Sequence, residues 1–175
     1  PSSRLGVVVG KYVGRLAALV VAGTAGIGAA LVTAAPGQAV VLGRLLVPTL
    51  VLGAAFLSLG FLISSLSRRQ ATATSVVVAV WFLLVFFYDL GLLGLLVGSD
   101  GAIGASLIGK LVLANPAGLF RVVMMARFAG PELLDGLGVD VGPPGALATT
   151  LMWSAWIALP VVIGGLLLGR QKEVR

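Results

Sequence analysis

Four long apolar runs dominate this sequence and constrain what it can fold into. They cover residues 16–34, 45–66, 74–97 and 146–168, and polar or Gly- and Pro-containing segments separate them. A helix that crosses a bilayer needs about 20 mostly apolar residues. The hydrocarbon core offers no water to backbone N–H and C=O groups, so such a run crosses as a helix. We therefore predict an all-α membrane protein with a helical bundle of four transmembrane helices, forming a single transmembrane domain over residues 1–175.

Composition excludes most other classes of protein. Only 10% of the residues are charged, against about 25% in soluble domains. The chain contains 0 Cys and 0 His, so disulfides, zinc sites, thiol nucleophiles and imidazole bases are excluded, and we expect no cofactor. The net charge of +6 comes from cations that stand singly or in pairs beside apolar runs. This pattern indicates membrane orientation and contact with lipid rather than nucleic acid. No G-x-x-x-x-G-K-[ST] phosphate loop occurs, so we predict no ATP hydrolysis by this chain.

The segment between the last two runs, residues 98–145, has helical patterning of its own. Apolar residues recur at helical spacing on both sides of Asn115-Pro116, which breaks the pattern. Each piece is too short to span, so we predict two short interfacial or re-entrant outer helices. The alternative is a fifth span over residues 111–129, which would place Arg121 within the membrane.

Positive residues predict the orientation. With the N-terminus in the cytoplasm, four spans return the C-terminus there, so that both termini are cytoplasmic and residues 98–145 lie outside. Eight cations would then face the cytoplasm, as the positive-inside rule requires: Arg4, Lys11, Arg15, Arg68, Arg69, Arg170, Lys172 and Arg175.

Small residues recur every fourth position along the first run. In lipid, helices associate by close backbone approach at small-xxx-small ridges. Gly and Ala fill about half of this stretch, however, so such a series could also arise by chance. The candidate packing ridge consists of Gly10, Gly14, Ala18, Ala22, Gly26 and Ala30.

Asp89 is a carboxylate within the third apolar run. A charge at mid-helix costs about 2.5–3.5 kcal/mol on insertion scales. One interpretation is a buried ion pair, with Arg121 as the partner in the outer segment. The other is that Asp89 reaches outer water, with Tyr88 as an interface anchor. The sequence leaves both open.

Several segments resemble a known family of transporters. Pro1-Ser-Ser-Arg4 followed by Gly10-Lys11 resembles the P-x-S-R…G-K stretch after the coupling helix of type-2 ABC exporter permeases. The W-F-L-x-V-x-x-x-D-L-x-L-L-G run that begins at Trp81 and the N-P-x-x-x-F-R run that begins at Asn115 are similar to permease subunits of transporters that mature nitrous oxide reductase.

The resemblance implies a six-helix permease of the bacterial inner membrane. It would work as a homodimer with a cytoplasmic ATPase subunit and a periplasmic partner protein, and would support assembly of the copper–sulfur centre of nitrous oxide reductase. The four spans would be the family's third to sixth, with the N-terminal helices and most of the coupling helix missing from this sequence. The candidate cytoplasmic coupling surface is then Arg4, Lys11, Arg68 and Arg69, although the last two also fit a purely topological role. The alternatives are an exporter permease for another substrate and a membrane scaffold that transports nothing.

Overall fold

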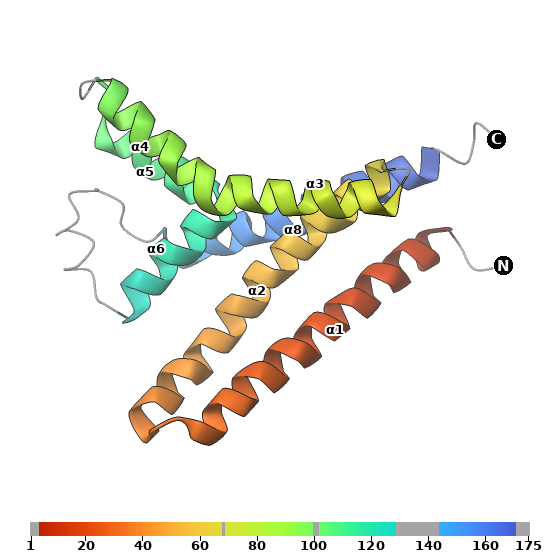
Figure 1. Cartoon of the computed structure of the whole chain (residues 1–175), viewed down its shortest axis with the longest axis horizontal. Coiled ribbons are helices and arrows are strands. Elements are labelled where there is room, and N and C mark those ends of the chain that lie inside the picture. The colour runs from red at the N-terminus through yellow and green to blue at the C-terminus, as the bar shows by residue number, and fades with distance from the viewer. Residues whose placement is uncertain (1–3, 68, 100–101, 129–143, 171–175) are drawn as a thin grey trace. The chain divides into compact units, whose positions relative to one another are not determined.

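The structure is a computed structural model that describes residues 4–67, 69–99, 102–128 and 144–170 (Figure 1). Helices account for nearly all of these residues, and the described parts contain no strand. In chain order the elements are α1 (Arg4–Thr33), α2 (Pro36–Leu66), α3 (Gln70–Phe82), a π-turn (Leu83–Phe87), α4 (Tyr88–Gly98), α5 (Ala105–Ala114), α6 (Pro116–Phe128) and α8 (Ala146–Arg170).

Four stretches of helix are long and apolar enough to cross a membrane, as predicted. They are Val9–Thr33, Pro36–Leu66, Gln70–Gly98 and Ala146–Leu168. The third consists of α3, the π-turn and α4 in continuous succession.

The second helix begins nine residues earlier than the apolar run, and capping groups make its first turn. Pro36 occupies the first helical position, where its missing N–H costs nothing. Gln38 Oε1 accepts a hydrogen bond from Ala35 N–H at 3.3 Å.

The two short helices predicted between the last spans are α5 and α6. Their axes are bent by 109° at Asn115. A straight fifth span over residues 111–129 is therefore not formed, because the chain turns sharply where Pro116 starts a new helix.

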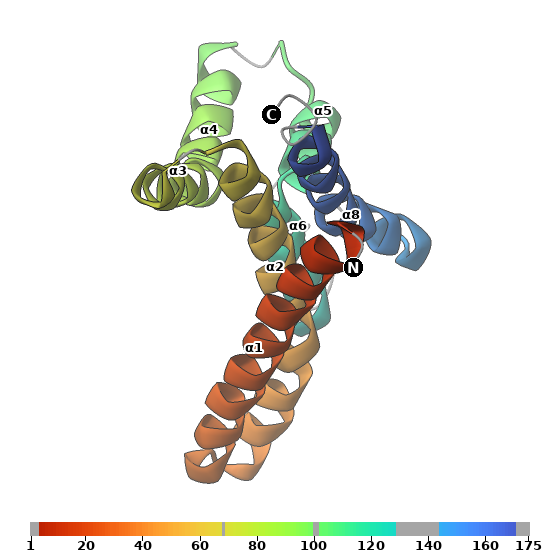
Figure 2. The same cartoon turned by 90° about the vertical axis from the view of Figure 1, so that its right-hand side faces the viewer.

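The chain divides into two compact units, one of residues 1–77 with 154–175 and the other of residues 78–153. In the first unit α1 and α2 run side by side (Figures 1 and 2). Their faces meet where one helix carries glycine. A Cβ placed on Gly53 would lie 3.0 Å from Leu19 Cδ1, and one placed on Gly23 would lie 2.6 Å from Leu50 Cδ2. Absent side chains thus let the backbones approach, which is how helices associate in lipid.

A buried hydrogen bond joins the same two helices. Tyr12 Oη lies 2.7 Å from Ser58 Oγ, and Ser58 Oγ donates its own hydrogen to Ala54 O at 2.8 Å. Since a serine hydroxyl has one hydrogen, Tyr12 is the donor to Ser58. The Tyr12 ring also meets Phe61 edge-on at 5.9 Å. Tyr12 is 9% exposed and Ser58 is fully buried.

The last helix contacts α2 through another glycine. A Cβ on Gly164 would lie 3.0 Å from Phe61 Cε1 and 3.2 Å from Ser65 Oγ. Phe61 therefore packs between Tyr12 of α1 and Gly164 of α8 and connects three helices of the first unit.

The small-residue ridge of α1 does not form the contact with α2. All six of its residues are exposed. No atom lies within 4 Å of a Cβ placed on Gly10, Gly14 or Gly26, leaving aside chain neighbours and the helix's own backbone. The α1–α2 contact uses Tyr12, Leu19 and Gly23 instead. The packing role of the ridge stays a prediction.

The Tyr12–Ser58 bond gives a test of this packing. Ser58→Ala would leave the Tyr12 hydroxyl buried without an acceptor, and we expect it to lower the free energy of unfolding by about 1–3 kcal/mol. Tyr12→Phe should cost less, about 0.6 kcal/mol, because Ser58 keeps its bond to Ala54 O. Unfolding in mixed micelles measures both values. Ser75→Ala, which removes an exposed bond within α3, serves as control, and equal costs for the two variants would contradict the assigned donor.

Candidate functional site

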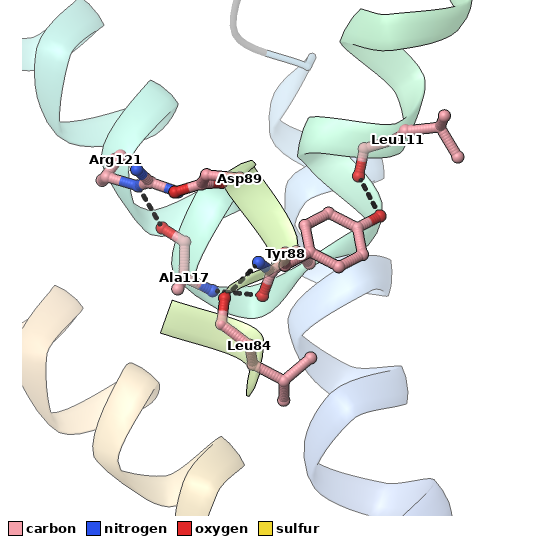
Figure 3. A network of polar contacts seen from close by, with 7 residues as sticks. Leu84, Tyr88, Asp89, Leu111, Ala117 and Arg121 are labelled. Atoms are coloured by element: carbon pink, nitrogen blue, oxygen red, sulfur yellow. Dashed lines mark hydrogen bonds and ion pairs between the residues drawn. The ribbon is translucent and has the colours of Figure 1, made fainter. Parts of the chain in front are cut away.

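Several polar groups of the second unit lie together where the π-turn of the third span meets the bend between α5 and α6 (Figure 3). We call this group the polar cluster. It consists of the side chains of Tyr88, Asp89, Asn115 and Arg121 with the backbone carbonyls of Leu84, Leu111 and Ala117.

Asn115 lies at the centre of the polar cluster and uses both ends of its amide. Its Oδ1 accepts from Ala117 N–H at 3.1 Å, so the residue acts as the N-cap of α6, with Pro116 at the first helical position. Its Nδ2 donates to Leu84 O in the π-turn at 2.6 Å. Asn115 is only 1% exposed, which makes these bonds necessary, because a buried amide without partners is costly.

The π-turn explains why a backbone carbonyl is available there. In a π-turn, hydrogen bonds run from residue i+5 rather than i+4 to residue i, and Tyr88 N–H accordingly donates to Leu83 O. Departures from α geometry in a transmembrane helix persist where neighbouring side chains satisfy the freed backbone groups. The Asn115 amide does this for Leu84.

Tyr88 ties the same region of the span to α5. Its hydroxyl donates to Leu111 O at 2.8 Å. Leu111 lies in the last turn of α5, where the helix no longer supplies an i+4 N–H donor to each carbonyl. Tyr88 is therefore not simply an interface anchor, as one interpretation of the sequence had it.

The structure brings Asp89 and Arg121 together. Arg121 Nη2 lies 2.5 Å from Asp89 Oδ2, and Arg121 Nε donates to Ala117 O on its own helix at 3.3 Å. Within this chain the pair is only partly buried, since the side chains of Arg121 and Asp89 are 49% and 33% exposed. The carboxylate thus has a cation as partner while one side of the guanidinium stays open to its surroundings.

The bend itself needs Gly118. A Cβ on this residue would overlap Val112 O of α5, a backbone atom that cannot move aside as a flexible side chain can. Leu119 is fully buried at the same place, and Ile108 and Val122 are each 7% exposed. The bent pair is therefore a fixed, well-packed elbow that holds Asn115 and Arg121 in place.

Comparison with known proteins identifies the family of the chain. Residues 1–172 match the family described as ABC-2 family transporter protein. The chain belongs to the ABC-2 transporter family. It is 32% identical over 174 residues to the probable ABC transporter permease protein NosY of Stutzerimonas stutzeri, with 93% of this chain and 63% of that protein covered. It is also 32% identical over 136 residues to the probable ABC transporter permease protein NosY of Pseudomonas aeruginosa, with 73% and 50% covered. The chain thus spans between half and two thirds of the length of these relatives.

The cationic residues singled out in this ABC-2 chain lie in the first unit. Lys11 is exposed on α1, and Arg69 is exposed just before α3. Arg4 begins α1, but its side chain lies outside the described residues, as does the whole of Arg68. The described residues contain no group of three or more His, Cys, Asp or Glu that could hold a metal ion.

Sequence reasoning identified Asp89 and Arg121 but missed the roles of Asn115 and Gly118. For Asn115 a signal was present, because Asn followed by Pro is a typical start of a helix. In the sequence pattern the same dipeptide predicts only a break between two helices. Nothing in the local sequence indicates that the spare amide hydrogen of Asn115 would reach Leu84.

The ion pair can be tested by a double-mutant cycle. Asp89→Asn and Arg121→Gln should each lower the free energy of unfolding by about 1.5–3 kcal/mol, the range for hydrogen bonds to charged groups. The double variant should lose less than the sum, because each single change leaves the other charge without its partner. The control combines Asp89→Asn with Arg127→Gln, an exposed cation in the last turn of α6, and its effects should add. Additive losses for Asp89 and Arg121 would show that their contact contributes nothing.

Proposed function

We propose that this chain is the membrane-spanning permease subunit of an ABC transporter and works with a separate cytoplasmic ATPase subunit. The observation that carries the proposal is the family match over residues 1–172. The four spans support it, because they could form a translocation path or transmit movement across the membrane. The sequence also has no phosphate loop, which supports a separate ATPase subunit. ATP-driven motion would then enter from a partner and be converted into movement of helices.

The proposed location is the bacterial inner membrane, with both termini cytoplasmic. The positive residues at the chain ends and at the turn between α2 and α3 support this orientation. The bent pair and the polar cluster would then lie at the outer face, because the third span carries the chain from Gln70 across to Gly98. Asp89 is 19 residues beyond Gln70, or about 28 Å along a helix axis at 1.5 Å per residue.

Cysteine labelling tests the orientation, and the chain has 0 native Cys to remove. An impermeant maleimide added to intact spheroplasts should label Ser106→Cys at the start of α5 and not Gln70→Cys at the start of α3. Both positions are exposed, so after permeabilisation both should react, which is the control. Labelling of Gln70→Cys alone in intact spheroplasts would reverse the topology.

Contacts with the other subunits are assigned by resemblance and by exposure. Arg4, Lys11, Arg68 and Arg69 form the proposed coupling surface for the ATPase. The exposed ridge from Gly10 to Ala30 would pack against another transmembrane helix of the assembled transporter, which the resemblance implies to contain two copies of the permease. A periplasmic partner would bind on the outer side.

The proposed task is support of copper–sulfur centre assembly in nitrous oxide reductase. Two observations support it, namely the similarity of the runs around Trp81 and Asn115 to permeases of that maturation system and the relatives named NosY. The proposal includes two modes of action: the permease exports a cargo, or it transmits a conformational change to the outer partner. The alternatives are export of another substrate and a scaffold that only anchors partners.

Gene deletion separates these functions. A strain without this gene should make a nitrous oxide reductase that lacks the catalytic copper–sulfur centre but retains its electron-transfer copper site. The native gene should restore the centre. The matched control restores the permease beside an ATPase subunit that cannot hydrolyse ATP. Recovery in that control would favour the scaffold, and a complete reductase in the deletion strain would leave only export of another substrate.

A further inference from the structure

The π-turn in the third span decides which face of α4 meets the elbow. A turn closed by i+5 hydrogen bonds contains one residue more than an α-turn. Every residue after Phe87 is therefore rotated by about 100° and displaced by about 1.5 Å relative to an uninterrupted α-helix. In effect each residue of α4 occupies the place that its predecessor would have in such a helix.

Three contacts join the span to the elbow, of which the first depends on the open turn itself and the other two on the register of α4. They come from Leu84, Tyr88 and Asp89, which reach Asn115, Leu111 and Arg121 respectively. If the turn closed to α geometry, Phe87 would take the place of Tyr88 and Tyr88 that of Asp89. The hydroxyl bond to Leu111 O and the ion pair would both be lost.

The residues at the two ends of the turn have ordinary helical dihedral angles. Phe82 has φ −58° and ψ −43°, Phe87 has φ −72° and ψ −27°, and Tyr88 has φ −61° and ψ −45°. All lie in the right-handed helical region. Because both ends of the turn are already helical, we expect conversion to α geometry to keep the chain in the helical region, and we expect the contacts with the elbow to determine which register is stable.

We propose that the π-turn acts as a rotational catch. By this we mean a turn that the contacts of Asn115 and of the Asp89–Arg121 pair keep in the π register, and that returns to α geometry when they are lost. While the elbow engages the span, the amide of Asn115 satisfies Leu84 O and the π register persists. When the elbow moves away, Leu84 O loses this donor and the turn closes, so that α4 rotates by one residue. Movement of the bent pair and rotation of α4 are then one coupled event. The use of this event in a transport cycle rests on the proposed function, whereas the catch itself does not. Asn115 is a positioning residue in this device.

The register can be measured from the way in which lipid exposure varies from residue to residue along α4. Leu92 is half-buried and lies one helical turn after Tyr88, which contacts the elbow, whereas Leu90 and Leu93 are 61% and 57% exposed. Spin labels at single cysteines introduced along residues 90–97 of the full-length protein in membranes report oxygen accessibility, with a minimum expected at position 92. Closing the catch should shift the pattern by about 100° and move the minimum to position 91.

Two variants of Asn115 and one deletion test the catch. Asn115→Ala removes both amide bonds, and Asn115→Ser keeps an N-cap for α6 but cannot reach Leu84 O, so both should show the shifted pattern. Deletion of Phe87 removes the extra residue, and combined with either variant it should return the minimum to position 92. Ser99→Ala, which removes a bond within the end of α4, should leave the pattern unchanged. An unshifted pattern in the Asn115 variants, or a deletion that fails to restore it, would overturn the proposal.

A second measurement needs no change at Asn115. In the complete transporter, the pattern of α4 should differ between the nucleotide-free state and a state trapped with ATP, and deletion of Phe87 should abolish the difference. An identical pattern in both states, with normal ATP hydrolysis, would show that the catch is not used while leaving the permease function intact. If the Asn115 variants show the shifted pattern but the native complex hydrolyses no ATP, the catch would stand and the proposed permease function would fail.

Discussion

The need to satisfy every backbone hydrogen bond without water governs this structure. It explains why the apolar runs are helices, and it makes any departure from α geometry depend on a side chain that can replace the lost bond. The π-turn in the third span is such a departure. The amide of Asn115 satisfies Leu84 O and, with its other end, caps α6. One buried side chain therefore stabilises an irregular turn and a helix start together, and it fixes the elbow to the span.

Charge and packing follow from this arrangement. The elbow brings Arg121 to Asp89, so the carboxylate has a cation beside it in the span. Gly118 permits the two short helices to meet closely enough for that contact. In the first unit the helices are joined in another way. Here α1 and α2 approach each other at Gly23 and Gly53 and share a tyrosine–serine hydrogen bond. Both units thus combine glycine contacts with a small number of well-satisfied polar groups.

These features suit a subunit that transmits movement. Helices joined by specific polar bonds have discrete arrangements, because each bond is either made or broken. The chain belongs to the ABC-2 transporter family, and under the proposed function such arrangements would change in response to a partner subunit. The polar cluster is the part of the second unit where such a change of state would be registered.

The sequence by itself determined the four spans, the two short helices broken at Asn115-Pro116 and the presence of a carboxylate within the third span. These properties are local, because the transfer free energy of each run depends on its own residues and a proline acts on its own turn. Only the tertiary structure decided that the third span contains a π-turn, that Asn115 reaches it, and that the small-residue ridge of α1 faces away from α2. These outcomes depend on which distant backbone atoms come within hydrogen-bond distance, and no periodicity of the sequence encodes that.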